Sequence, residues 1–335
     1  MAEVVLAVMA VAATLYAVLG GADFGAGLID PFMDERDQKR IDVAIAPVWE
    51  ANHVWLVLLA TLAFVGFPRV YAVASGYLHI PLLLVLLGIV ARGSAFTFRH
   101  YDPEPGPHVH GYTLAFRTGS LLTPLFLGIT LAALAYGRLD TDPTRSFYEA
   151  YVAPWNTWFG WATGLFTCGL FAFLGAALLA AENARHAGTL PYLRLARRAH
   201  LAAIALGAHV FVAAWFERLP WLARLVRSPV ALACMATATL LVPVIAYGFS
   251  HGHPWVVRVA AGAQTSSILA GFFAGQYPAL IRMSSTDLTV GATAAPAPTL
   301  RALLWAVFVG LCAIVPGTVY LIRVYKSPTS SAEKR

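Results

Sequence analysis

Residues 4–28 read VVLAVMAVAATLYAVLGGADFGAGL, and the only charged side chain in this stretch is that of Asp23. An α-helix rises about 1.5 Å per residue, so roughly 20 apolar residues cross the hydrocarbon layer of a bilayer, which is about 30 Å thick. A backbone inside that layer must form its hydrogen bonds within its own segment, and a helix does so. Because the first charged residue is Glu3 and no basic segment precedes the apolar run, we expect a transmembrane helix here rather than a cleaved signal peptide.

Eight further apolar runs have the same length and character. We expect helices near residues 48–67, 78–98, 115–136, 158–181, 200–216, 230–249, 256–273 and 303–322. Pro47 suits the first turn of the second helix, where a missing N–H costs nothing. Prolines between residues 101 and 110 mark a loop, and Pro296 marks another before the last helix.

The composition excludes a soluble protein. Of the 335 residues, 59% are hydrophobic and 12% are charged, whereas soluble proteins carry about 25% charged residues. Too few charged side chains are present to cover a water-facing surface, so most of the surface must face lipid. We therefore predict an all-α integral membrane protein of about nine transmembrane helices, arranged as two four-helix bundles plus one extra helix. Residues 1–326 would form a single polytopic membrane domain and residues 327–335 a polar cytoplasmic tail.

The positions of the basic residues predict the orientation in the membrane. The connections after the first, third, fifth, seventh and ninth helices hold fourteen of the 23 Arg and Lys residues. Cytoplasmic connections carry the excess of Arg and Lys, so we expect the C-terminus in the cytoplasm and the N-terminus outside. Because these residues lie mostly in short loops, the net charge of +6 sets orientation and does not predict nucleic-acid binding.

Ionisable side chains within the predicted helices are the candidate functional residues. Asp23, Glu50 and Arg92 are costly in hydrocarbon, and such residues are functional hypotheses for that reason. The predicted topology places all three in the cytoplasmic half of the membrane, with Glu50 in the first turn of the second helix. His53 lies three residues after Glu50 and shares its helix face, and Asn52 lies beside them.

Two interpretations of these residues remain open at this level. Glu50, His53 and Asp23, starting at the cytoplasmic rim, have the composition of a proton relay in which Arg92 balances a carboxylate. Alternatively, Asp23 and Arg92 form a buried structural pair, and Glu50 lies at the level of the lipid headgroups.

Glycine and histidine patterns favour structural roles. Gly20, Gly21, Gly25 and Gly27 are small enough to let helices approach closely. Of ten histidines, only His209 lies clearly in the middle of a predicted helix, and one such residue is more typical of a hydrogen-bonded core position than of a haem ligand. We expect no haem and no metal site in this chain, since its three cysteines include no CxxC pair.

Several segments resemble subunit II of the cytochrome bd-type quinol oxidases. The resemblance is carried by GGADFGAG (20–27), IAPVWEANHVWLVLLATLAFVGFPRVYA (45–72) and ARGSAFTFR (91–99). Matching segments that follow in the same order as in that family are FAFLGAALLAAE (171–182), GQYPALI (275–281) and DLTVGATAAPAPTL (287–300). The resemblance therefore extends over nearly the whole chain.

The resemblance implies a role in a membrane complex that passes electrons from quinol to O2 and makes water. It implies a haem-bearing subunit I, with haem b and haem d, as the main partner, and this chain as a haem-free subunit that is not catalytic alone. A small single-helix subunit, membrane lipid and quinone are further partners that it implies, and some members hold a quinone or lipid in this subunit. The expected location is the bacterial cytoplasmic (inner) membrane.

The resemblance also assigns the charged residues. The acidic residue of the family's second helix matches Glu50, the Asp of its first helix matches Asp23, and the Arg of its third helix matches Arg92. Together these matches imply a cytoplasmic proton path. The sequence departs from the family at Gly20, where many members have Asp, and at His53, where the family often has an acid or an amide.

A proton-coupled membrane transporter is the alternative function. Such transporters contain paired helices that Gly or Pro interrupts near the middle of the membrane. Here most prolines lie at helix ends and the charges lie at one rim. A haem-binding anchor of a dehydrogenase would need two histidines on facing helices, and only His209 qualifies.

Overall fold

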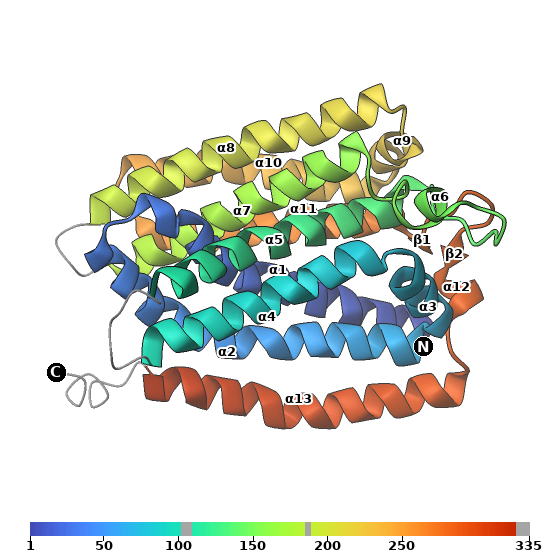
Figure 1. The fold of residues 1–335 in the computed structure, drawn as a ribbon, viewed down its shortest axis with the longest axis horizontal. Coiled ribbons are helices and arrows are strands. Elements are labelled where there is room, and N and C mark those ends of the chain that lie inside the picture. Colours follow the sequence, from blue (N-terminus) through green and yellow to red (C-terminus); the bar gives the residue numbers. More distant parts are fainter. Residues whose placement is uncertain (102–108, 185–188, 326–335) are drawn as a thin grey trace.

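In the computed structural model the chain forms long helices that lie side by side along one axis (Figure 1). The structure describes residues 1–101, 109–184 and 189–325, and at some helical positions, Glu50 among them, the side chain lies outside this description. The long helices of the described residues are α1 (Ala2–Ile29), α2 (Glu35–Gly66), α4 (His79–Tyr101), α5 (Val109–Tyr136), α7 (Trp158–Glu182), α8 (Thr189–Phe216), α10 (Pro229–Ser250), α11 (Pro254–Gln276) and α13 (Ala297–Tyr325).

The remaining elements are short and connect these helices. A 3-10 helix η1 (Asp30–Phe32) follows α1 at one end of the molecule. The others gather at the opposite end, near the N-terminus, as Figure 1 shows. They are α3 (Pro68–Tyr77), α6 (Phe147–Tyr151), α9 (Pro220–Arg227), α12 (Val290–Thr293) and a two-stranded antiparallel sheet of β1 (Ala279–Ile281) and β2 (Leu288–Thr289).

The membrane class predicted from the sequence is confirmed. Eight helices of the described residues are long and apolar enough to cross a bilayer. The second half of α2 (Ala51–Gly66) and α3 satisfy the same criteria together, although the chain bends by 115° between them. Counting this pair as one span gives nine, the number expected from the hydropathy pattern. The bend falls at Phe67–Pro68, where the helix predicted near residues 48–67 ends and where proline cannot continue the helical hydrogen bonding.

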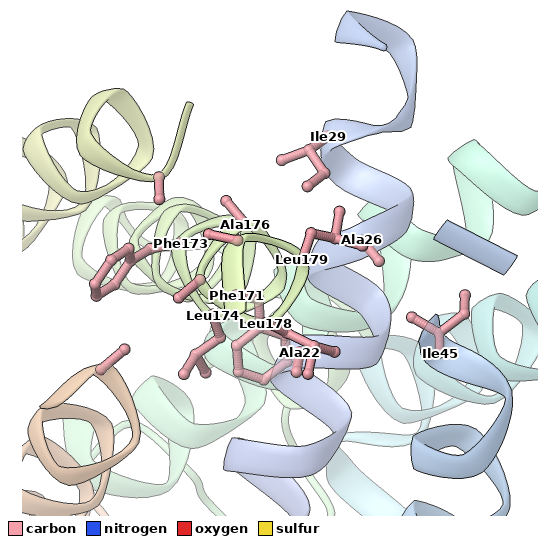
Figure 2. Close-up of a cluster of buried hydrophobic side chains, with 14 of the residues drawn as sticks. Ala22, Ala26, Ile29, Ile45, Phe171, Phe173, Leu174, Ala176, Leu178 and Leu179 are labelled. Carbon is pink, nitrogen blue, oxygen red and sulfur yellow. The ribbon is translucent and has the colours of Figure 1, made fainter. Parts of the chain in front are cut away.

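The helices pack as two groups of four with one outside. Helices α1, α2, α4 and α5 form the first bundle, and α7, α8, α10 and α11 form the second. The two bundles meet where α1 and α5 pack against α7, and α13 lies on α2. Figure 2 shows the centre of this junction, where Ala22 of α1 lies beside Leu174 and Leu178 of α7, and Ala26 lies near Leu179.

Close contact between α1 and α7 depends on glycine. A Cβ atom at Gly25 would collide with the carbonyl oxygen of Phe171, and a Cβ atom at Gly175 would collide with the backbone of Gly25 and Ala26. Gly21 of α1 faces Leu174 of α7. The predicted role of these α1 glycines in helix approach is therefore confirmed at Gly21 and Gly25.

Four helices begin earlier than predicted: α5 and α13 by a few residues, and α2 and α8 by many more. α2 begins at Glu35, so Pro47 lies inside the helix and Glu50 lies near its middle, not in a first turn. α8 begins at Thr189, well before the predicted start near residue 200. Hydropathy detects only the lipid-facing part of a helix, and both helices continue beyond it as polar turns. Proline is tolerated inside membrane helices because neighbouring groups satisfy the freed backbone atoms.

Candidate functional site

An ion pair between α1 and α4 lies in the interior of the first bundle. The Nη2 atom of Arg92 donates to Oδ1 of Asp23, and also to the backbone carbonyl of Asp23 at 3.3 Å. The Asp23 side chain is fully buried and the Arg92 side chain is 1% exposed. The two residues predicted to meet do so, although 69 positions separate them in the chain.

Aromatic rings surround the guanidinium of Arg92. Its Cζ atom lies 5.4 Å from the ring centre of Phe24, 5.6 Å from that of Phe96 and 5.1 Å from that of Phe116. A cation over an aromatic face is attracted by the negative face of the ring, and the attraction is stronger when water is excluded. The rings therefore help to hold a charged guanidinium in an apolar interior and fix its direction toward Asp23.

The predicted α2 residues lie around this pair. Asn52 is fully buried against Gly20 of α1, where a Cβ atom would lie 2.8 Å from Nδ2 of Asn52. His53 is half-buried, and its ring meets the Trp49 ring edge-on at 5.5 Å between centres. Trp49 in turn contacts Phe96, one of the three rings around Arg92, also with 5.5 Å between ring centres.

Glu50 is the predicted site residue whose position is only partly described. Its backbone lies in α2 between Trp49 and Ala51, and its side chain lies outside the described residues. The part predicted for Glu50 in a relay therefore stays a prediction. Its helical neighbours Trp49 and Asn52 contact α4 and α1, so this segment of α2 adjoins the ion pair.

A second buried carboxylate, which sequence reasoning missed, lies two turns further along the chain, at the start of η1. Asp30 is fully buried; its Oδ1 accepts from Nη1 of Arg99 at 3.1 Å and its Oδ2 accepts from Nε of Arg117 at 2.7 Å. The guanidinium of Arg99 lies 4.4 Å from the ring centre of Phe116. The count of basic residues assigns Arg99 and Arg117 to the connection after the third predicted helix, where they would only set orientation.

The spacing of the two pairs was a signal for this second site. Asp30 follows Asp23 by seven residues, and Arg99 follows Arg92 by seven. α1 and α4 start at the same end of the molecule and run in the same direction (Figure 1), so one shift of two turns along both helices carries the first pair onto the second.

Two histidines of α8 have side-chain hydrogen-bond partners, one at the surface of the helices and one in the core. Nε2 of His209 accepts from Nε1 of Trp158 at 3.0 Å. Nε2 of His200 lies 3.2 Å from Oε1 of Gln264. Among the described residues no three His, Cys, Asp or Glu side chains come together as a metal site would require. His209 is therefore hydrogen-bonded as predicted, but its bond lies at the exposed surface of the helices and not in the core.

The chain is similar to a known protein family over nearly its whole length. The family model described as cytochrome bd terminal oxidase subunit II matches residues 1–325. The chain belongs to this family. The resemblance noted in its motifs is confirmed, and the assignment favours the oxidase interpretation over that of a transporter.

Individual relatives agree with the family. The chain is 38% identical over 129 residues to cytochrome bd ubiquinol oxidase subunit 2 of Bacillus subtilis, covering 37% of each chain. It is 29% identical over 193 residues to cytochrome bd-I ubiquinol oxidase subunit 2 of Escherichia coli, covering 56% of this chain and 50% of the relative. The matched stretches thus span at most half the length of these relatives.

The fold also has a solved counterpart. A chain from the structure of bd oxidase from Geobacillus thermodenitrificans superposes with a TM-score of 0.78, covering 97% of this chain and 98% of that one. At 18% sequence identity, this likeness shows the fold. The arrangement of helices is therefore one that a bd oxidase chain adopts over its whole length.

Proposed function

We propose that this chain is the haem-free second subunit of a cytochrome bd-type quinol:O2 oxidoreductase. It supports a haem-bearing subunit I and provides part of a path for protons from the cytoplasm. The observation that carries this proposal is the fully buried Asp23–Arg92 pair, which adjoins the Trp49–His53 segment of α2 in a member of the subunit II family. A pair of ionised groups so deep in a membrane domain is costly and marks a functional site.

The reaction explains why such a path is needed. Two quinols reduce one O2 to two waters, so four electrons and four protons reach the oxygen, while the two quinones formed leave four protons behind. If the quinol protons are released outside and the oxygen takes its protons from the cytoplasm, the reaction builds a membrane potential. Hydrocarbon does not conduct protons, so polar side chains must carry them to the haem-bearing partner.

The residues divide into carriers and one positioning residue. Glu50 would take the proton on the cytoplasmic side, with His53 beside it and Asp23 as the next acceptor. A guanidinium stays protonated throughout the physiological range, so Arg92 cannot pass a proton on. Its hydrogen bonds to Asp23 and its position between three phenylalanine rings support a role in holding the Asp23 carboxylate in place.

The expected surroundings follow from the family. The haem b and haem d of the complex would reside in subunit I, and a small single-helix subunit, membrane lipid and quinone would complete it. Arg99 and Arg117 lie at the end of the helices where α1 finishes, in agreement with a cytoplasmic location of that end. We propose that the protein resides in the bacterial cytoplasmic membrane with its N-terminus outside.

The deciding experiment is Glu50→Gln in the assembled complex, with haem content and quinol-dependent O2 uptake measured together. Normal haem content with slow turnover would support proton delivery through Glu50. Loss of haem would indicate a structural role, and unchanged turnover would refute the path.

The matched control is Glu182→Gln. Glu182 is the last residue of α7, at the end of the molecule where α1 finishes, and it accepts a hydrogen bond from Arg258 at 2.8 Å. This variant removes a carboxylate of the same type outside the first bundle, so its turnover should stay normal.

A further inference from the structure

One face of the second half of α1, continued by Asp30 at the start of η1, carries polar residues and glycine. Tyr16, Gly20, Asp23, Gly27 and Asp30 are spaced by four, three, four and three residues, which places all five on one side of a helix. The distance from Tyr16 to Asp30 is about 21 Å along the axis, or roughly two-thirds of a 30 Å hydrocarbon layer.

The contacts confirm that this face looks into the first bundle. Gly20 lies against Asn52 of α2, and Gly27 lies so close to Ser120 of α5 that a Cβ atom there would collide with its hydroxyl. Asp23 pairs with Arg92 of α4. The glycines of α1 therefore have two roles: Gly21 and Gly25, on the opposite face, admit α7, whereas Gly20 and Gly27 leave room for polar side chains.

Several buried polar atoms along this face have no hydrogen-bond partner among the described residues. They are the Tyr16 hydroxyl, Oδ2 of Asp23, Oδ1 and Nδ2 of Asn52, and the Ser120 hydroxyl. In proteins the great majority of such atoms are hydrogen-bonded, to protein or to water. Because these belong to one face of one helix and its neighbours, they make a polar interior suited to hydrogen-bonded water.

The second bundle does not share this property. There His200 bonds to Gln264, whose Nε2 donates to the carbonyl of Ala238 at 3.0 Å. In the described part of the chain, buried polar side-chain atoms without a hydrogen-bond partner also occur at the far end of the helices, around α9 and β1. They belong to Trp221, Arg224, Gln276 and Arg282.

We propose that protons follow this face of α1 from Asp23 past Asn52 to Tyr16, and that the Tyr16 hydroxyl is the relay residue nearest the middle of the membrane. The proposal rests on the proposed function and names the further residues of the same path. Tyr16 is 5% exposed, and its hydroxyl has no hydrogen-bond partner among the described residues. Seven residues, or about 10 Å, separate it from Asp23 along the axis, so water beside Asn52 would complete the chain.

The transfer at Tyr16 needs no other reactant. The hydroxyl oxygen accepts a proton on a lone pair from the Asp23 side and releases its own O–H proton on the other side, so its net charge is unchanged. Asn52 carries no proton and acts by orienting the water beside Gly20. Asp30 lies on the same face, but both of its carboxylate oxygens accept hydrogen bonds from guanidinium groups, those of Arg99 and Arg117. We therefore place the entry of protons beside α2 and not at Asp30.

The test is Tyr16→Phe in the assembled oxidase, which removes one oxygen atom and keeps the ring. We expect quinol-dependent O2 uptake to fall about tenfold in kcat, with unchanged KM for quinol, normal haem content and a larger solvent deuterium isotope effect. The loss is smaller than the ~100-fold expected for removal of a catalytic acid, because water replaces part of the hydroxyl's role. The control is Tyr192→Phe, a tyrosine of α8 that is equally buried, at 3% exposed, in the same apolar core.

Each outcome has a defined meaning. Normal turnover of Tyr16→Phe while Glu50→Gln is slow would refute the route along α1 and leave the proposed function intact. Normal turnover of both variants would refute the proposed path as well. If Tyr16→Phe fails to assemble, Asn52→Leu, which is similar in volume, decides: a slow enzyme with full haem supports the route, and a normal one overturns it.

Discussion

Removing either Arg92 or Asp23 should destabilise the protein. The loss of stability should depend on pH when Arg92 is removed and should not depend on pH when Asp23 is removed. In Arg92→Gln, the carboxyl of Asp23 stays fully buried without its cation. It can then remain in place only by binding a proton. In Asp23→Asn, the guanidinium of Arg92 is left in the same interior, and it cannot lose its proton at any pH of interest.

The size of the effect follows from the ordinary titration of an aspartate. Protonating a carboxyl of pKa about 3.9 at pH 7 costs roughly 4 kcal/mol, since each pH unit is worth about 1.4 kcal/mol. This agrees with the ~3–5 kcal/mol lost when one partner of a buried pair is removed. The folded Arg92→Gln variant binds one proton more than its unfolded form, so its stability falls as pH rises and recovers by about 1.4 kcal/mol for each unit of acidification.

The assay is the midpoint of thermal unfolding of the purified complex between pH 8 and pH 5.5, measured for the wild type, both single variants and the double variant Asp23→Asn/Arg92→Gln. Relative to the wild type, Arg92→Gln should recover on acidification and Asp23→Asn should not. The double variant should be more stable than either single one, because it leaves no unpaired charge. The reasoning would be refuted if the unfolding midpoint of Arg92→Gln stayed below that of the wild type by the same amount at every pH. It would also be refuted if the midpoint of the double variant fell by the sum of the decreases in the two single variants.

Three further predictions follow from other parts of the structure. Gly25→Ala should prevent α1 from reaching α7 and reduce assembled complex by tenfold or more on membrane blots, whereas Gly76→Ala, which meets open space, should leave it unchanged. Asp30→Asn should lower the unfolding midpoint, because two guanidiniums lose their carboxylate, yet leave kcat within about twofold, and a larger fall in kcat would place Asp30 on the path. Hydrogen bonds from the Ser146 side chain and backbone lower the pKa of Glu149 in α6, so these bonds are present at neutral pH and are lost as pH falls through that lowered pKa. Faster amide exchange of residues 146–151 at pH 3.5 than at pH 6, after correction for the intrinsic rate, would agree with this, and an equal corrected rate would contradict it.

Much of the architecture was readable from sequence because membrane insertion is a local property. Hydropathy found each long helix, and the Phe67–Pro68 step marked the bend between α2 and α3. The short elements between helices were missed, since α9 and the β1–β2 hairpin carry no signal of comparable length. Pro47 was misplaced because the polar start of α2 lies outside the apolar run on which the prediction depended.

The candidate site shows the same division. The sequence by itself determined that Asp23 and Arg92 lie within helices in one half of the membrane, since their depth depends only on position along each span. Which charge meets which was decided by tertiary structure: Asp23 pairs with Arg92, and Asp30 with Arg99 and Arg117, because α1, α4 and α5 pack at a particular rotation. The same rotation turns Gly25 toward α7 and Gly20 toward Asn52. The hydropathy of a helix does not change when the helix rotates about its axis, because any apolar face can contact lipid. Ion pairs and glycine contacts, in contrast, form only where two particular helix faces meet.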